Sequence, residues 1–182
     1  SCTGYINKFG VDFATITLNA FDSIPGPENP NRALAYNPAN GHLYTANWDS
    51  PIYEIDLNGD TINMWSNAYN HYGAAIQDSF LWFSSQEYTA QGYPNKLYKF
   101  SLSDTVYVDS IEFPIPAGYS YMTAGGLTYW PDWHGMGVLF ELVQGDPHDF
   151  IVVLAPTARW ETKFWSQEGF AQVADALCER YG

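Results

Sequence analysis

The sequence predicts an all-β protein made of β-propeller-like blades, each a four-stranded antiparallel sheet. Short strands separated by Gly, Pro, Asn and Asp turns fill residues 33–66, and the same order recurs over 73–113 and 125–165. The three copies start about 40 and 52 residues apart, which is the period of propeller blades. Aromatic residues, which favour strands, make up 18% of the chain. We therefore expect a single propeller-like domain over residues 1–182.

The N-terminal segment predicts half a blade. The stretches "GYINKFG" and "DFATITLNAF", within residues 4–21, have the pattern of the last two strands of a blade that lacks its first two. The segment "DSIPGPENPNR" follows. Its Pro and Gly content predicts an ordered loop, not a helix, that crosses to the next blade.

The first complete blade, residues 33–66, has the clearest pattern. In its first hairpin, Pro38 fixes φ and Asn40-Gly41 supplies the positive φ of a tight turn. Pro51 ends the second strand because it cannot donate to a sheet ladder. The segment "IYEIDL" alternates apolar and polar residues, as expected of a strand exposed on one face, and "NGD" turns into the fourth strand "TINMW".

The later copies are less regular. In residues 73–113, "FLWFSSQ", "KLYKFSL" and "VYVDSIEF" take the places of the second, third and fourth strands, whereas the third strand within 125–165 lacks the acidic–apolar alternation. The final segment "SQEGFAQVADALCERYG" predicts a short amphipathic helix over about 167–180, with Ser166 as its N-cap. We expect this helix to cover an exposed blade face, and docking to a partner is the alternative.

Residues 33–60 resemble the blade repeat of the YVTN/NHL group of secreted β-propellers. The signature of that repeat is a Leu-Tyr-x-x-Asn strand followed by an Ile-Tyr-x-Ile-Asp strand. The matching residues are Leu43, Tyr44, Asn47, Ile52, Tyr53, Ile55 and Asp56. The resemblance implies a propeller fold and hardly any chemistry, because propellers host enzymes, lectins and scaffolds alike.

About three and a half blades are predicted from these copies, whereas closed propellers usually have about four to eight. The chain is then a fragment of a longer propeller, a distorted four-bladed unit finished by the half-blade, or one of several chains that supply each other's missing strands. Cys2 and Cys178, the only cysteines, lie near the two ends. We expect a disulfide between them, within one chain if the blades close and between chains otherwise. Two unrelated thiols are the alternative.

Charge and terminal sequence bear on partners and location. With 7 basic and 20 acidic residues the net charge is −13, which opposes binding to nucleic acid or to an anionic membrane surface. No apolar run approaches the roughly 18 residues needed to cross a bilayer. The chain begins "SCTGY", without an initiator Met or an apolar leader. We therefore expect an extracellular protein whose signal peptide has been removed, with a trimmed chain as the alternative.

No catalytic residue and no metal site is predicted. The sequence lacks a Gly-x-Ser-x-Gly elbow, a His-Glu-x-x-His pair, a Cys-x-x-Cys pair and a phosphate-binding glycine loop. The histidines are expected to be solvated loop residues; they are His42, His71, His134 and His148. The segment "DLNGD", with Asp56, Asn58 and Asp60, is expected to be a hairpin turn because the downstream Glu of a calcium loop is missing. No cofactor is therefore expected, with Ca²⁺ as the alternative.

A candidate ligand-binding face is formed by two sets of loops. These loops join strand four to the next strand one, and strand two to strand three. They combine flat rings with hydrogen-bonding side chains, which suits sugar rings or peptide backbones. The candidate binding residues are Trp48, Asp49, Tyr69, Tyr72, Tyr88, Tyr93, Tyr119 and Tyr121. Packing of these rings against neighbouring loops or chains is the alternative.

The expected function is that of an extracellular, non-enzymatic propeller. Because the blade count is incomplete, we expect copies of the same chain to be its first partner, assembled into a ring or a filament. A structural or interaction module at a surface is the other expected form of this function. The alternative is a carbohydrate- or peptide-binding module that uses the aromatic loop face. A third class is an enzyme such as a metal-dependent lactonase, which would need Glu, Asn and Asp ligands that converge on a central channel.

Overall fold

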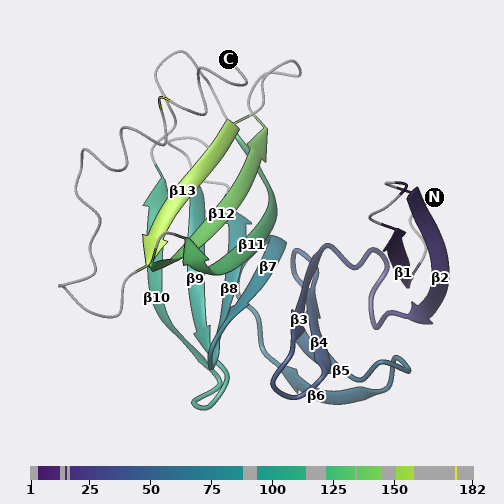
Figure 1. Ribbon diagram of the computed structural model, residues 1–182. Helices are drawn as coiled ribbons and strands as arrows, with labels where there is room; N and C mark the ends of the chain where they lie inside the picture. The colour runs from purple at the N-terminus through teal and green to yellow at the C-terminus, as the bar shows by residue number, and fades with distance from the viewer. Residues whose placement is uncertain are drawn as a thin grey trace.

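The chain folds into an open array of antiparallel β-sheets. A computed structural model describes residues 4–12, 15, 17–87, 94–113, 122–133, 135–144, 151–157 and 175. Within them the chain forms thirteen strands in four sheets (Figure 1). All the strands within a sheet are consecutive in the sequence and pair antiparallel, so each sheet is a meander.

The four sheets follow one another along the chain. The first sheet consists of β1 (Tyr5–Asp12) and β2 (Thr17–Pro25). The second sheet consists of β3 (Ala33–Asn37), β4 (His42–Ala46), β5 (Ile52–Ile55) and β6 (Thr61–Trp65). The third sheet consists of β7 (His71–Gln77), β8 (Phe80–Gln86), β9 (Asn95–Ser101) and β10 (Val106–Phe113). The fourth sheet consists of β11 (Thr123–Trp133), β12 (Met136–Gln144) and β13 (Ile151–Thr157).

Turn residues fix the hairpins of the second sheet. Between β3 and β4, Gly41 has a φ of 77°, which a residue with a side chain rarely adopts. Between β5 and β6, Asp56 Oδ1 accepts hydrogen bonds from the backbone amides of Asn58 and Asp60, at 2.8 and 2.9 Å. Gly59 has a φ of 94° in the same turn. The "DLNGD" segment is therefore the hairpin turn that the sequence predicts.

Apolar side chains fill the two spaces between neighbouring sheets. Strand β3 alternates, with Ala33 and Ala35 buried and Leu34 and Tyr36 exposed. The core between the second and third sheets consists of Ala33, Ala35, Tyr44, Ala46, Ile52, Ala74, Leu81, Phe83, Tyr98 and Phe100. The core between the third and fourth sheets includes Ala75, Trp82, Leu97 and Leu139. Both faces of the third sheet are thus covered, as in stacked blades.

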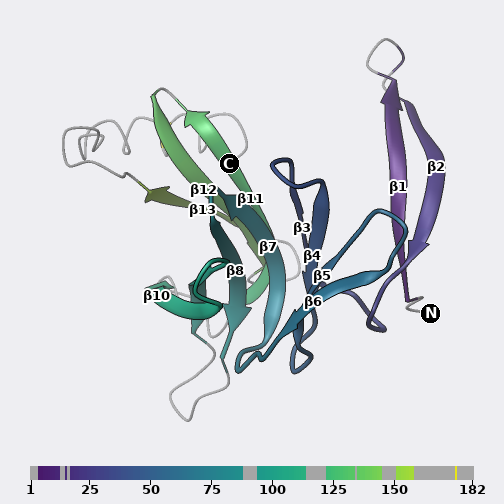
Figure 2. The same cartoon turned by 90° about the horizontal axis from the view of Figure 1, so that it is seen from below.

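The first strands of the three larger sheets lie side by side. Strand β7 is flanked by β3 on one side and by β11 on the other (Figure 2). The approach to β11 depends on Gly73, because a Cβ there would collide with the carbonyl oxygen of Gly125 and the amide of Leu127. Strands β7 and β11 are therefore packed backbone to backbone at this point, as expected of inner strands around the axis of a propeller.

The predicted fold class is confirmed in these residues. The chain is all-β, it has four-stranded antiparallel sheets, and the array is open. Cys2, Cys178 and residues 158–165 of the third predicted blade lie outside the described residues, and so does the helix expected at 167–180 except for Asp175. The single-domain organisation remains a prediction. No helix in the described part of the chain is long and apolar enough to span a membrane.

Candidate functional site

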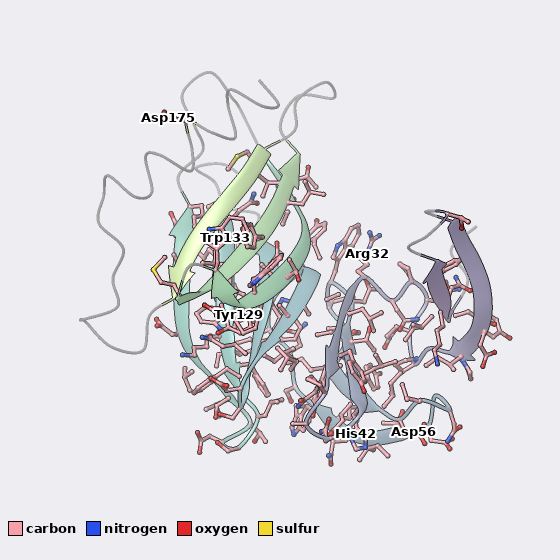
Figure 3. The ribbon with its side chains drawn as sticks, in the orientation of Figure 1. Arg32, His42, Asp56, Tyr129, Trp133 and Asp175 are labelled. Carbon is pink, nitrogen blue, oxygen red and sulfur yellow. The ribbon has the colours of Figure 1, made fainter. Side chains whose placement is uncertain are left out.

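Part of the predicted binding face comes together at one end of the sheets. We call this the upper end; there β4, β6, β8, β10 and β12 finish. The rings of Trp48 and Tyr72 lie 5.8 Å apart between centroids, and the guanidinium carbon of Arg32 lies 3.8 Å from the Trp48 ring centroid. Figure 3 shows Arg32 at the upper end of the second sheet and His42 at the opposite end. Asp49 is exposed next to Trp48 in the sequence.

Tyr69, another predicted binding residue, packs within the protein. Its ring stacks on Tyr98 with centroids 3.8 Å apart and meets Tyr107 edge-on at 4.8 Å. These contacts fit the alternative in which the ring packs against its neighbours. The remaining predicted binding residues lie outside the described residues; they are Tyr88, Tyr93, Tyr119 and Tyr121.

His71 is not the solvated loop residue that the sequence predicts. The strand β7 begins two residues earlier than expected, so His71 is its first residue and is fully buried. The imidazole stacks on Phe83 at 3.8 Å, and its Nδ1 and Nε2 lie 2.6 and 2.7 Å from the hydroxyls of Ser85 and Tyr107. Burial lowers the pKa of His71 to about 3, so the ring is neutral.

The proton positions around His71 follow from Asn67. Its Nδ2 donates to the carbonyl of Tyr69 at 2.8 Å, so its Oδ1 accepts from the Tyr107 hydroxyl at 2.7 Å. Because that hydroxyl has a single proton, His71 Nε2 donates to it, and His71 Nδ1 accepts from Ser85. Both ring nitrogens have partners in this network, which therefore fixes the strands in place and leaves no ring nitrogen for a ligand.

A second set of polar side chains lies between the third and fourth sheets. We call Ser84, Gln86, Asn95 and Glu141 the inter-sheet polar cluster. In the β8–β9 register Gln86 is opposite Asn95, and Ser84 is two residues before Gln86, so the three side chains share one face. Ser84 Oγ donates to Glu141 Oε1 on β12, and Gln86 Nε2 donates to the Met122 carbonyl. The cluster thus joins the two sheets near the upper end.

Several polar atoms of this cluster have no hydrogen-bond partner although they are buried. They are Glu141 Oε2, Asn95 Nδ2 and Asn95 Oδ1, from side chains that are 1% and 0% exposed. A buried polar group without a partner costs about 1–3 kcal/mol, so folded proteins retain few of them. The cluster therefore contains donors and acceptors that no hydrogen bond of the described residues uses.

The carboxyl of Glu141 has a pKa near neutral pH. Burial raises its pKa to about 7, and the hydrogen bond from Ser84 opposes this rise. A general acid or base is most effective when its pKa lies near the working pH. Oε1 of Glu141 is held by Ser84, and Oε2 is the oxygen without a partner.

Sequence reasoning missed this cluster, although the sequence holds a signal for it. Glu141 interrupts the apolar run "MGVLFELVQ", and three polar residues, "SSQ", end the apolar strand β8. A charged residue on the covered face of an apolar strand has to be buried, as Glu141 is beside Leu139 and Val143, and buried carboxyls are enriched at functional sites. A search for sequence motifs does not find this buried carboxyl, because its burial depends on which strand faces are covered by a neighbouring sheet.

A different buried carboxylate, Glu54, lies towards the lower end of the second sheet and is fully satisfied. It accepts hydrogen bonds from Tyr44, Asn40 and Asn63 at 2.8, 3.1 and 2.6 Å, and its Oε1 lies 2.7 Å from His42 Nδ1. Burial alone would raise the pKa of Glu54, but bonds from Asn63, His42 and Tyr44 lower it below its ordinary value. This carboxylate stabilises the sheet and has little capacity left for a ligand.

Metal ligands are not grouped in the described part of the chain. No set of three or more His, Cys, Asp or Glu residues there could hold a metal ion. In the "DLNGD" turn, the carboxylate oxygens of Asp56 accept hydrogen bonds from Asn58 and Asp60. A calcium ion in that turn remains a prediction.

Comparison with known proteins identifies the fold but no family. No family model matches the chain, and no curated protein matches it. Among solved structures, the chain is similar to the crystal structure of glutaminyl cyclase from Myxococcus xanthus, with a TM-score of 0.56 and 11% identity. The match covers 86% of this chain and 67% of that chain. At this identity the likeness shows the propeller-like fold alone.

The comparison corrects the function expected from the sequence. We expected an extracellular, non-enzymatic propeller that assembles with copies of itself. The structure that the chain resembles is an enzyme, and none of the comparisons supports an assembly module. The expectation failed because it took a function from the number of blades, whereas the function of a propeller resides in its sites.

Proposed function

We propose that the chain is a propeller enzyme that acts on a carboxamide group. The observation that supports this proposal best is the buried carboxyl of Glu141, with an unpartnered oxygen and a pKa of about 7, in one cluster with the unpartnered carboxamide of Asn95. The solved structure of similar fold is named a glutaminyl cyclase. Cyclisation of an N-terminal glutaminyl residue is therefore the reaction we propose.

The chemistry of this reaction matches the groups in the cluster. The α-amine nitrogen attacks the side-chain carboxamide carbon, a new C–N bond closes the lactam, and the old C–N bond breaks to release ammonia. One proton has to leave the attacking nitrogen and one has to reach the departing nitrogen. Glu141 Oε2 takes the first and returns it to the second, as a general base and then a general acid. Asn95 Nδ2 donates to the carbonyl oxygen as negative charge develops there.

The position of the cluster sets the direction from which a substrate arrives. Asn95 is the first residue of β9, and Glu141 lies close to the end of β12. Both are therefore near the upper end, where loops of a propeller bind ligands. The proposed kinship with the YVTN/NHL group rests on residues 33–60, and it adds no catalytic residue to this account.

The proposal is tested with a peptide that begins with glutamine. We expect the wild-type protein to release ammonia and to convert the peptide into its lactam, as measured by ammonia assay and mass spectrometry. Glu141→Gln keeps the shape of the side chain but cannot accept the proton, so we expect turnover to fall by about a hundredfold or more.

The matched control is Glu112→Gln. The Glu112 side chain is 59% exposed at the end of β10 and pairs with Lys96 at 3.2 Å, so its loss is expected to leave turnover unchanged. A peptide with alanine in place of the N-terminal glutamine controls for contaminating hydrolases. Absence of ammonia release by the folded wild type, or equal release by Glu141→Gln, would reject the proposal.

A further inference from the structure

Arg32 and Trp48 form a surface feature that the proposed reaction does not use. Arg32 is exposed just before β3, where its backbone amide donates to the Ala46 carbonyl at 3.3 Å. Its guanidinium carbon lies 3.8 Å from the Trp48 ring centroid, and the Tyr72 ring lies 5.8 Å from that of Trp48. We call these three residues the Arg32 platform.

The guanidinium of Arg32 differs from the ammonium of Lys96 in its surroundings. Lys96 Nζ pairs with the carboxylates of Glu87 and Glu112 at 3.0 and 3.2 Å. Among the described residues no carboxylate pairs with Arg32. Lys99 also lies over a ring, with its Nζ 4.0 Å from the Phe80 centroid, but an ammonium lacks the flat pair of N–H groups that matches a carboxylate.

Stacking prepares the guanidinium to bind an oxyanion. A ring below the flat guanidinium holds its plane, and the N–H groups at its edge remain free. These N–H groups match the two oxygens of a carboxylate, and less entropy is lost because the side chain is already ordered. Trp48 is 39% exposed, so it also offers apolar surface beside the charge.

We propose that the Arg32 platform binds a carboxylate attached to a flat or ring-shaped apolar group. The carboxylate takes two hydrogen bonds from Arg32, and the apolar group lies against Trp48 and Tyr72. This site is separate from the inter-sheet polar cluster, because Arg32 and Trp48 flank strands of the second sheet, whereas the cluster lies between the third and fourth sheets. The inference therefore does not depend on the proposed reaction.

Asp49 is expected to weaken the binding of a carboxylate to the Arg32 platform. It is exposed and follows Trp48 directly, so its charge opposes that of an arriving carboxylate. Asp49→Asn is therefore expected to strengthen binding of the carboxylate about two- to threefold, and to leave neutral ligands unaffected.

The test uses phenylacetate and its neutral analogue phenylacetamide, which differ mainly in charge. Both are titrated into the protein labelled with nitrogen-15, and the shift of the Trp48 indole N–H is followed; Trp48→Phe assigns that signal. We expect phenylacetate to bind more tightly than phenylacetamide. Arg32→Gln is expected to weaken phenylacetate binding by about tenfold or more, because a charge-assisted pair is lost.

Two further results complete the test. Arg32→Lys keeps the positive charge but loses the planar pair of N–H groups that binds both oxygens of a carboxylate. This variant should therefore retain only part of the wild-type affinity for phenylacetate. Unfolding free energies of the three Arg32 proteins should agree within about 1 kcal/mol, because the side chain is exposed and an exposed cation–π contact contributes little more than this. Equal binding of the two probes, equal binding by Arg32→Gln, or tighter binding of inorganic phosphate than of phenylacetate would overturn the proposal.

Discussion

Two buried ionisable residues, His71 and Glu141, respond to pH in opposite directions. The pKa of His71 falls from 6.5 to about 3 on folding, so the unfolded chain binds the extra proton and stability decreases as pH falls below 6.5. The pKa of Glu141 rises from 4.5 to about 7, so the folded chain binds the extra proton and stability decreases as pH rises above 4.5. Between pH 4.5 and 6.5 the two effects on the unfolding free energy offset each other.

Glu141→Gln should reveal the contribution of His71. In this variant we expect the unfolding free energy to rise with pH between 4.5 and 6.5 more steeply than in the wild type, by up to about 1.4 kcal/mol per pH unit. Urea unfolding at pH values across this range measures the slope. Parallel curves for the two proteins would show that Glu141 is not protonated preferentially in the folded state.

Asn95→Leu should separate stability from activity. The carboxamide of Asn95 has no partner and is fully buried, so an apolar side chain of similar size removes the cost of its desolvation. We expect the unfolding free energy to rise by about 1 kcal/mol while turnover of the glutaminyl peptide is lost.

The comparison for Asn95→Leu is Gln86→Leu on the same face. Gln86 does have a partner, the Met122 carbonyl, so its replacement is expected to lower the unfolding free energy. If Asn95→Leu were as destabilising as Gln86→Leu, the Asn95 carboxamide would have a partner in solution and would not be held open for a substrate.

At the scale of the elements, the contact between β7 and β11 holds the third and fourth sheets at a short distance. Gly73 makes this possible, because any Cβ at that position meets the backbone of residues 125–127. The same contact sets the distance from Ser84 to Glu141, since these residues belong to the two sheets that it joins. Gly73 therefore affects both the packing of the third and fourth sheets and the geometry of the inter-sheet polar cluster.

Gly73→Ala is expected to lower the unfolding free energy by about 1–3 kcal/mol, because the two backbones have to separate. Gly126→Ala in the neighbouring strand is the matched control. Nothing lies within 4 Å of a Cβ built at Gly126, so its change should stay within about 0.5 kcal/mol. Thermal unfolding monitored by circular dichroism measures both, and equal effects would contradict the proposed close approach.

Local patterns in the sequence were sufficient to predict the strands and turns. Asn40-Gly41 and "DLNGD" predict hairpins because the positive φ of a turn is encoded by the turn residues themselves. His71 was misplaced because its burial depends on the stacking of Phe83 and on the neighbouring sheets. The polar cluster was missed for the same reason: Ser84 and Glu141 are 57 residues apart, and only sheet-to-sheet packing joins them.

At the scale of the whole molecule, the sheets form an open series and not a closed ring. Strand β3 has its outer face exposed, with Leu34 and Tyr36 at 40% and 52% exposure. The third sheet is the one covered on both faces, and it contributes Ser84, Gln86 and Asn95 to the polar cluster. The candidate site thus lies in the part of the series where packing is most complete, which is where the positions of side chains are best fixed.

The most direct test of the account is the pH dependence of kcat/KM for an N-terminal glutaminyl peptide. We expect the rate to change with an apparent pKa of about 7, and we expect this titration to disappear in Glu141→Gln together with most of the rate. A wild-type rate that does not titrate near this pH would contradict the account. So would a titration that Glu141→Gln retains, since the proton-transferring group would then lie elsewhere in the molecule.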